Sequence, residues 1–430
     1  MGASTTSAGP DPLPGPAGPA TAAAVGLAAA QLAANGIAVI FTAVFARLLG
    51  ADDYGVLTAG LASFLIFSVP GSALQVATAR AVAGRSLGAR GELHATLRRW
   101  TARMVAITGG LTVAGIVLRG PLAAVMGIDA PSVAAATLPT VSLWLLLCVQ
   151  RGTLAGLGHF KPVGASIVGE AAGRLALGAA LAGAGLGATG AYLGTPLAMA
   201  ATAVALALVA ERRLPAAPGV HPARLRVFAA SAGAPIAALA FIAVLQNVDL
   251  IIVRHHVADD AAGAYAAAAV AAKVVVWTAV GVGLYLIPGA ATRATQGLDP
   301  RPVLLRALAV VAAVAAPALL VMIAVPGTVL RLGFGAEYEV ADAALPLLAV
   351  AMTTLALTYL AVTFLLAIGS HGFLVPLALV ALAEPLTLAL PSYSRLDRFA
   401  AVVLALQGAA ACAVLVPSLR RAAAPVPAGA

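Results

Sequence analysis

The residues of this chain whose types could do chemistry are the few charged side chains inside long apolar segments. They are Lys273, Asp249, Glu384 and the pair of Glu170 and Arg174. Burying a charge at the centre of a membrane-spanning helix costs at least about 2.5 kcal/mol, so such a group normally faces water or a partner. An ammonium group can hold an anion such as phosphate, and a buried carboxyl can take up and release a proton. These residues are therefore the first candidates for a functional site.

Lys273 and Asp249 each have more than one interpretation. Lys273 stands near the middle of its apolar segment, where it would either hold a phosphate in a central cavity or pair with Asp249 on the neighbouring segment. Asp249 stands about one turn from the end of its segment, close to Arg254. It would pair there, extend to the membrane interface or bind a coupling ion. The sequence leaves these alternatives open.

The two glutamates differ in the partners that their own segments offer. Glu170 and Arg174 are four residues apart, so they lie on one face of a helix and can form an ion pair. Glu384 has no such partner in its segment and stands before Pro385. Apolar surroundings favour the neutral form of a carboxyl, so the proton of Glu384 could be mobile. Asp249, Glu384 and Glu170 are therefore the candidates for ion coupling.

Polar residues outside this set complete the candidate site. Gln31 and Asn35 are four residues apart and could hydrogen-bond sugar hydroxyls or join two helices. Arg80 ends an apolar segment, where it would anchor the helix or present its planar guanidinium to a phosphate. The candidate substrate-binding residues are thus Lys273, Arg80, Gln31 and Asn35. We expect no metal site and no cofactor, because His, Cys, Asp and Glu show no metal-ligand spacing.

The elements that must position these residues follow from composition. Of the 430 residues, 62% are hydrophobic and 10% charged, and the mean hydropathy is +1.02. Soluble domains average roughly 45–50% apolar and about 25% charged residues, so a soluble enzyme is excluded. The strands of a membrane barrel would need alternating polarity rather than long apolar runs. We therefore predict an all-α polytopic membrane protein with no catalytic domain.

The apolar runs are long enough for twelve spans, at about 20 residues for each. They are expected near 23–46, 56–79, 104–126, 132–154, 162–183, 189–210, 228–253, 263–290, 303–330, 342–367, 373–391 and 399–417. The predicted domains are an N-terminal tail (1–22), a six-helix lobe (23–210), a linker (211–227), a second six-helix lobe (228–417) and a C-terminal tail (418–430).

The basic residues predict the sidedness. The net charge of +9 comes mainly from arginines in short loops, which argues against nucleic-acid binding. Most of the 25 Lys and Arg residues fall in loops on the side of the N-terminus, Arg151 among them, and the hydrophilic connection near 80–103 is Arg-rich. Cytoplasmic loops carry the excess of Lys and Arg. Both termini are therefore expected in the cytoplasm, with the chain in the plasma membrane.

The two halves of the chain match in order. Arg47 with Ala51-Asp52-Asp53 matches Arg254 with Ala258-Asp259-Asp260, and Glu170 matches Glu384. The matched positions lie 207 to 218 residues apart. Because six spans bring the chain back to the same side, the lobes are expected to be related by a pseudo-two-fold axis along the membrane normal. Such repeats place a cavity between the lobes and favour a transporter that works by alternating access.

Three segments resemble a known family. They are Phe45–Gly55, then Asn247–Val253 with Gly263-Ala264-Tyr265 and Ile287-Pro288, and finally Gly333–Tyr338 with Ala343–Leu348. These segments are similar to motifs of the polysaccharide exporters of the multidrug/oligosaccharidyl-lipid/polysaccharide (MOP) exporter superfamily. The resemblance covers roughly residues 25 to 415.

The resemblance implies a flippase for lipid-linked oligosaccharides used in cell-surface polysaccharide synthesis. The implied partners are a polyprenyl-pyrophosphate-linked glycan, membrane lipid and glycan-assembly proteins, with no nucleic acid. One alternative is an ion-coupled multidrug antiporter of the same fold, whose cavity would be lined by acids. Another is a non-transporting scaffold of a glycan-assembly complex.

Overall fold

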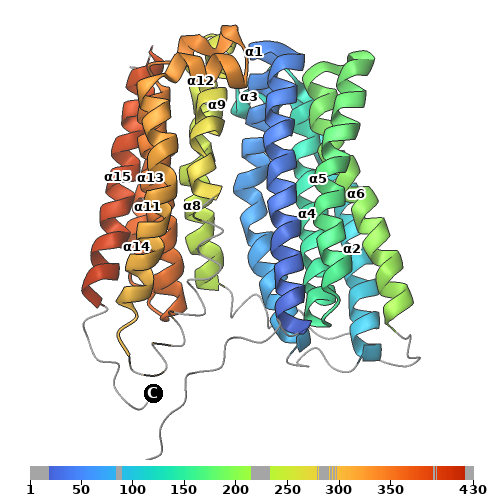
Figure 1. Cartoon of the computed structure of the whole chain (residues 1–430). Helices are drawn as coiled ribbons and strands as arrows, with labels where there is room; N and C mark the ends of the chain where they lie inside the picture. Colours follow the sequence, from blue (N-terminus) through green and yellow to red (C-terminus); the bar gives the residue numbers. More distant parts are fainter. Residues whose placement is uncertain are drawn as a thin grey trace, which may run out of the picture.

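The computed structural model describes residues 19–83, 90–214, 233–277, 298–390 and 395–421, together with 279, 290, 293, 296 and 393. This part of the chain is helical and contains no strand. The predicted tails and linker lie largely outside it, as does the Ile287-Pro288 motif. Figure 1 shows the helices side by side in two groups, which we call the first group (α1–α6) and the second group (α8–α15).

The helices of the two groups follow one another in the same order. The first group contains α1 (Pro19–Ala83), α2 (Arg90–Val117), α3 (Arg119–Met126), α4 (Pro131–Gly156), α5 (Phe160–Leu181), the π-helical turn η1 (Ala182–Leu186) and α6 (Gly187–Arg213). The second group contains α8 (Gly233–Ile252), the 3₁₀ turn η2 (Val253–His255), α9 (Asp259–Ala272), α11 (Arg301–Ala324), α12 (Pro326–Gly333), the 3₁₀ turn η3 (Ala336–Ala341), α13 (Leu345–Ala367), α14 (Leu374–Leu388) and α15 (Leu396–Arg421).

Within the described residues, nine helical stretches are long and apolar enough to cross a membrane. Two of them, Ala29–Ser68 with 40 residues and Phe160–Arg213 with 54, are each long enough for two crossings, since one crossing needs about 20 residues. The prediction of an all-α polytopic membrane protein is confirmed. The twelve spans and the boundaries of the two lobes stay predictions.

Some predicted boundaries differ from the helix ends, while others agree with them. The first two predicted spans lie on either side of a bend in α1 at Gly50, where φ is +76°. Glycine has no Cβ to oppose a positive φ, so the chain turns there without leaving the helical hydrogen-bonding pattern for long. The helix α2 begins at Arg90, so residues 90–103 of the predicted hydrophilic connection are helical. The ninth span is divided between α11 and α12, because Pro326 has no amide hydrogen to continue a helix.

Helix lengths repeat between the groups. Both α3 (Arg119–Met126) and α12 (Pro326–Gly333) have eight residues, and their first residues are 207 positions apart. The first residues of α5 and α14, Phe160 and Leu374, are 214 positions apart. These offsets fall inside the range of the sequence matches, which agrees with the predicted internal repeat.

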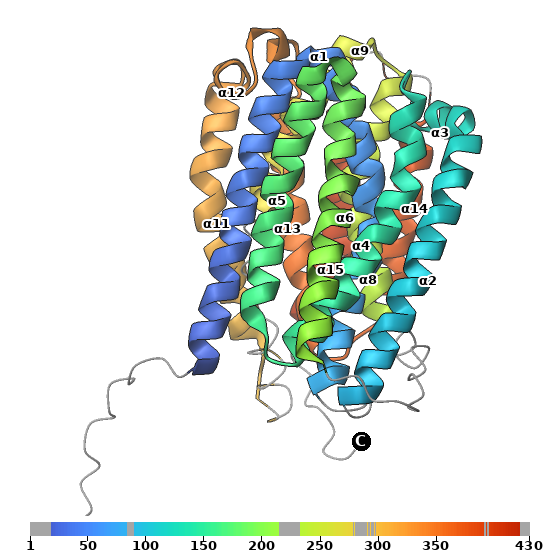
Figure 2. The ribbon, with the colours of Figure 1, turned by 90° about the vertical axis from the view of Figure 1, so that its right-hand side faces the viewer.

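The groups contact each other at one end of the bundle, which we call the capped end. It carries the α1 bend at Gly50 together with α3, η2, α12 and η3, and it is uppermost in Figures 1 and 2. Tyr54 of the first group is buried in edge-on contact with Tyr338 and Phe334 of the second, with ring centroids 5.9 and 6.3 Å apart. We call the opposite end, where α15 finishes, the tail end.

Small residues allow the backbones of the two groups to approach at the capped end. A Cβ added to Gly263 of α9 would collide with the carbonyl oxygen of Ala51 in α1. A Cβ added to Gly55 would lie 3.1 Å from the Cα of Gly263. Small-residue contacts of this kind hold helices together in membranes, where lipid is as apolar as the side chains.

Candidate functional site

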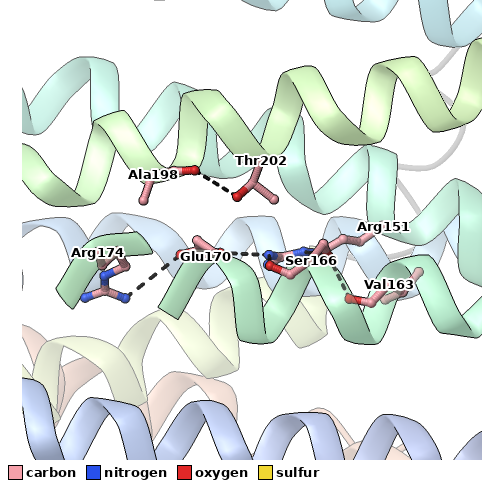
Figure 3. Close-up of polar contacts among 7 residues, drawn as sticks. All are labelled: Arg151, Val163, Ser166, Glu170, Arg174, Ala198 and Thr202. Atoms are coloured by element: carbon pink, nitrogen blue, oxygen red, sulfur yellow. Dashed lines mark hydrogen bonds and ion pairs between the residues drawn. The ribbon is translucent and has the colours of Figure 1, made fainter. Parts of the chain in front are cut away.

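The first group contains a buried charge network built from α4 and α5, which Figure 3 shows with Glu170 between two arginines. The Nη2 atom of Arg151 lies 2.8 Å from Oε2 of Glu170, and its Nε donates to the hydroxyl of Ser166 at 2.9 Å. The predicted pair of Glu170 with Arg174 is present at 4.0 Å. Arg151 is therefore the closer partner of Glu170.

Arg151 corrects the sequence analysis, which placed it in a loop. It stands in the last two turns of α4 and is buried, with its guanidinium 5.8 Å from the ring centre of Trp144. Because Arg151 and Glu170 are 19 residues apart on different helices, no local spacing pattern pointed to their contact.

Arg174 has more freedom than Arg151. Its side chain is 27% exposed, its guanidinium lies 5.5 Å from the ring centre of Phe41, and its Nε has no hydrogen-bond partner among the described residues. It stands 14 residues into α5, about 21 Å along the helix at 1.5 Å per residue. The network holds two arginines and one glutamate, so the first group carries an excess positive charge at membrane depth.

The second group contains a buried polar cluster from α8, α9 and α14. Lys273 donates from Nζ to the amide oxygen of Asn247 at 3.2 Å, and Tyr265 donates to Asp249 Oδ2 at 3.0 Å. Neither Oε1 nor Oε2 of Glu384 has a hydrogen-bond partner among the described residues, and the whole side chain is buried. Lys273, Asp249 and Glu384 interact electrostatically with one another.

The positions of these side chains bear on the alternatives that the sequence left open. Lys273 is 95% buried beside Asn247 and close to Asp249, which agrees with the interpretation of a charge pair within the second group. The expected pair of Asp249 with Arg254 is wrong, because Arg254 instead contacts Asp259 at 2.6 Å. Sequence reasoning missed Asn247 and Tyr265, although the sequence places Asn247 only two residues before Asp249.

The predicted amides and Arg80 are separate from both clusters. Gln31 donates to Asn35 at 3.1 Å on the exposed surface of α1, as their spacing predicts. The side chain of Arg80 lies outside the described part of the structure. The structure therefore does not bring the four predicted substrate-binding residues together among the side chains that it describes.

Two arginines at matched repeat positions connect the groups at the capped end. Arg47 of the first group donates to the carbonyl oxygen of Leu332 in α12 at 2.5 Å. Arg254 of the second group donates to the carbonyl oxygen of Gly127, directly after α3, at 2.8 Å. Each arginine thus bonds the end of the other group's eight-residue helix. We call Arg47 and Arg254 the cross-group arginines.

Removing the cross-group arginines is expected to open the capped end. A hydrogen bond to a charged group contributes about 1.5–3 kcal/mol, so the double variant Arg47→Gln with Arg254→Gln should favour separation of the groups by a factor of roughly 100 or more. Spin labels at the exposed positions Val125 and Val340 measure the separation. The control is Arg331→Gln, since Arg331 pairs at 3.4 Å with Glu339 inside its own group. An unchanged label distance in the double variant would contradict the assignment.

The sequence matches no family model and no curated protein. The fold is similar to that of the lipid II flippase MurJ in an inward closed conformation, with a TM-score of 0.71 and 12% identity over 91% of this chain and 87% of that chain. It is also similar to a multidrug resistance MATE family transporter of the MOP superfamily in its inward-facing conformation, with a TM-score of 0.66 and 15% identity over 89% and 98% of the two chains.

This chain has the MOP-transporter fold. The resemblance of its motifs to this superfamily is confirmed at the level of the fold, and the similar structures are those of membrane transporters. An outward-facing MATE family structure matches less well, with a TM-score of 0.58 and 16% identity over 93% and 95% of the two chains. The contacts between the groups described above lie at the capped end.

Proposed function

We propose that this chain is a flippase for lipid-linked oligosaccharides that carry a pyrophosphate, and that it works by alternating access. In this proposal, twelve spans form two lobes (23–210 and 228–417) related by a pseudo-two-fold axis along the membrane normal. Both termini lie in the cytoplasm, so the capped end faces outside. The positive-inside rule and the similarity to a protein named as a lipid II flippase support this arrangement.

The observation that carries the proposal is the excess positive charge in the first group. Arg151 forms an ion pair with Glu170 at 2.8 Å, whereas Arg174 lies 4.0 Å from Glu170 and its side chain is 27% exposed. A cation at membrane depth that is not fully paired is costly unless it faces water or binds a ligand, and an anionic ligand would complete its pairing. The planar guanidinium of Arg174 binds two oxygens of a phosphate at once. The surface amides of Gln31 and Asn35 would bind sugar hydroxyls in the same proposal.

The other candidate residues have roles that follow from their positions. Arg80 remains a proposed phosphate ligand near the tail end of α1. Lys273 would reach a phosphate only by leaving Asn247, so we place it in the ion-coupling cluster with Asp249 and Glu384. Glu170 is assigned to holding Arg151 and Arg174 rather than to carrying an ion.

The alternative function is a multidrug antiporter. The MATE family structures of the same fold support it, as do the buried carboxylates of the second group, because such antiporters exchange cations. The described carboxylates Glu170, Glu384 and Asp249 are buried within their own groups, where they are not available to a cationic drug. The excess charge of the first group therefore favours an anionic substrate.

Reconstituted vesicles distinguish these functions. Translocation is measured with a fluorescent polyprenyl pyrophosphate-linked disaccharide, and drug transport with a lipophilic cationic dye. We expect the native chain to translocate the lipid and not the dye. Replacing Arg174 by glutamine should slow translocation by about tenfold or more, the loss of one charge-assisted hydrogen bond.

The matched control is Arg213→Gln, which removes the same charge from an exposed position at the end of α6. It should leave the translocation rate close to that of the native chain. Dye transport without lipid translocation would replace the flippase by the antiporter, and equal rates for both variants would remove Arg174 from the site.

A further inference from the structure

The internal repeat offers a comparison of two glutamates at the same helix position. Glu170 stands ten residues after the first residue of α5, and Glu384 stands ten residues after the first residue of α14. Both are buried. The two sites therefore differ mainly in what surrounds the carboxylate, and that difference indicates what each one does.

Among the described residues, the site around Glu384 lacks arginines like those around Glu170. Leu388 stands 214 residues after Arg174, at the matching position of α14, and it is buried. The helix α13 corresponds to α4 but contains no charged residue. No residue of α13 can therefore pair with Glu384 as Arg151 pairs with Glu170. Glu170 has two cationic partners, while neither oxygen of Glu384 has a hydrogen-bond partner among the described residues.

The charges around Glu384 come from two neighbouring helices. α8 contributes Asp249, and α9 contributes Lys273 together with the phenol of Tyr265, which donates to Asp249. On α15, the buried and neutral Gln407 donates to the carbonyl oxygen of Leu245 in α8. Two carboxyls and one ammonium share this buried site, so full ionisation would leave one uncompensated negative charge.

An uncompensated buried charge costs several kcal/mol, and a group in that position normally becomes neutral. Asp249 receives the hydrogen bond from Tyr265 and is the better stabilised of the two carboxylates. Glu384 has no donor among the described residues. The extra proton of the cluster therefore belongs on Glu384, while Asp249 and Lys273 balance each other.

From this arrangement we infer that Glu384 binds and releases a proton during transport, while Lys273 is a permanent positive charge beside it. Proton movement, rather than binding of a metal cation, then drives the transport cycle. The inference rests on the proposed transport function. When Glu384 releases its proton to water on one side of the membrane, it becomes a carboxylate and the cluster carries one negative charge. Uptake of a proton from the other side restores neutrality. The buried ammonium of Lys273, which interacts electrostatically with both carboxyls, supplies the positive charge that a free cation would otherwise bring.

A proline beside the glutamate supplies a place where the helix can move. Pro385 follows Glu384, whereas Ala171 follows Glu170 in the first repeat. Proline cannot donate to the carbonyl oxygen one turn earlier, so the helix bends readily at this point. The helix α14 also ends four residues after Glu384, while α5 continues to Leu181. Glu384 thus lies near the end of α14, beside a proline that weakens the hydrogen bonding of the helix.

Infrared spectroscopy of the purified protein tests the proton site without any substrate. A neutral carboxylic acid in apolar surroundings gives its own carbonyl band. We expect this band in the native chain at neutral pH, its loss in Glu384→Gln, and its loss in Leu388→Arg, which restores the arginine of the first repeat. The control Glu337→Gln, at an exposed position of the capped end, should keep the band. A band that persists in Glu384→Gln would overturn the inference.

Vesicle transport then tests the coupling. A pH gradient across the vesicle should accelerate translocation by the native chain, and a sodium gradient at constant pH should not. Glu384→Gln should lose the acceleration by the pH gradient while still translocating lipid down its own gradient. Acceleration by sodium, or an unchanged response to pH in Glu384→Gln, would overturn proton coupling. If no variant or native chain moves the lipid although the carbonyl band behaves as expected, the proposed substrate fails and the proton site stands.

Discussion

Replacing Arg151 by leucine is expected to lower the free energy of unfolding by about 3–5 kcal/mol, the usual cost of removing one partner of a buried ion pair. The guanidinium of Arg151 makes three contacts, with Oε2 of Glu170, with the hydroxyl of Ser166 and with the carbonyl oxygen of Ser166. Without them, Glu170 keeps only Arg174 at 4.0 Å. Equilibrium unfolding in mixed detergent micelles measures the loss.

A double variant shows whether the loss comes from the uncompensated charge. Replacing both Arg151 and Glu170 by leucine removes the pair together, and apolar replacement of a buried pair is often neutral or stabilising. We therefore expect the double variant to recover most of the stability lost by Arg151→Leu. If the double variant is less stable than the single one, Arg151 acts through packing against Trp144 rather than through its charge.

The second large effect is expected at the contact between the groups. Adding one methyl group at Gly263→Ala places it against the backbone carbonyl of Ala51, which cannot rotate away as a side chain could. Overpacking of this kind typically costs about 1–3 kcal/mol, and a clash with backbone belongs at or above the upper end. The variant should therefore separate the groups at the capped end, which spin labels at Val125 and Val340 would detect as a longer distance.

The matched control is Gly233→Ala at the first residue of α8. A Cβ at this position has no heavy atom within 4 Å, so the same chemical change meets open space. We expect the label distance and the stability of this variant to equal those of the native chain. A Gly263→Ala variant with the native distance would show that the capped end is not held by the close approach of α1 and α9.

The membrane class and the helices were predictable from sequence for one reason. Apolar runs of about 20 residues have few alternatives to a spanning helix, because backbone polar groups must be satisfied within the segment. Contacts within one helix were also predictable from the sequence. The pairs of Gln31 with Asn35 and of Glu170 with Arg174 follow from the four-residue spacing alone, and both are present in the structure.

The contacts between helices were not predictable in the same way. Arg151 and Glu170 are 19 residues apart, and the bond from Tyr338 to the carbonyl oxygen of Ala46 spans 292 residues. Which face of a helix meets which neighbour depends on rotation about the helix axis. A helix that is apolar on every side, such as α13, gives no hydropathy signal for that rotation.

The sequence by itself determined that this chain is a helical membrane protein, and it identified Glu170 and Glu384 at matching positions of the predicted repeat. Only the tertiary structure decided that Glu170 is held by two arginines while Glu384 lies beside a lysine without a hydrogen-bond partner among the described residues. The physical reason is that hydropathy and short spacing are local properties of the chain. The charge around a buried carboxylate is instead the sum of contributions from helices distant in sequence, and packing alone brings them together.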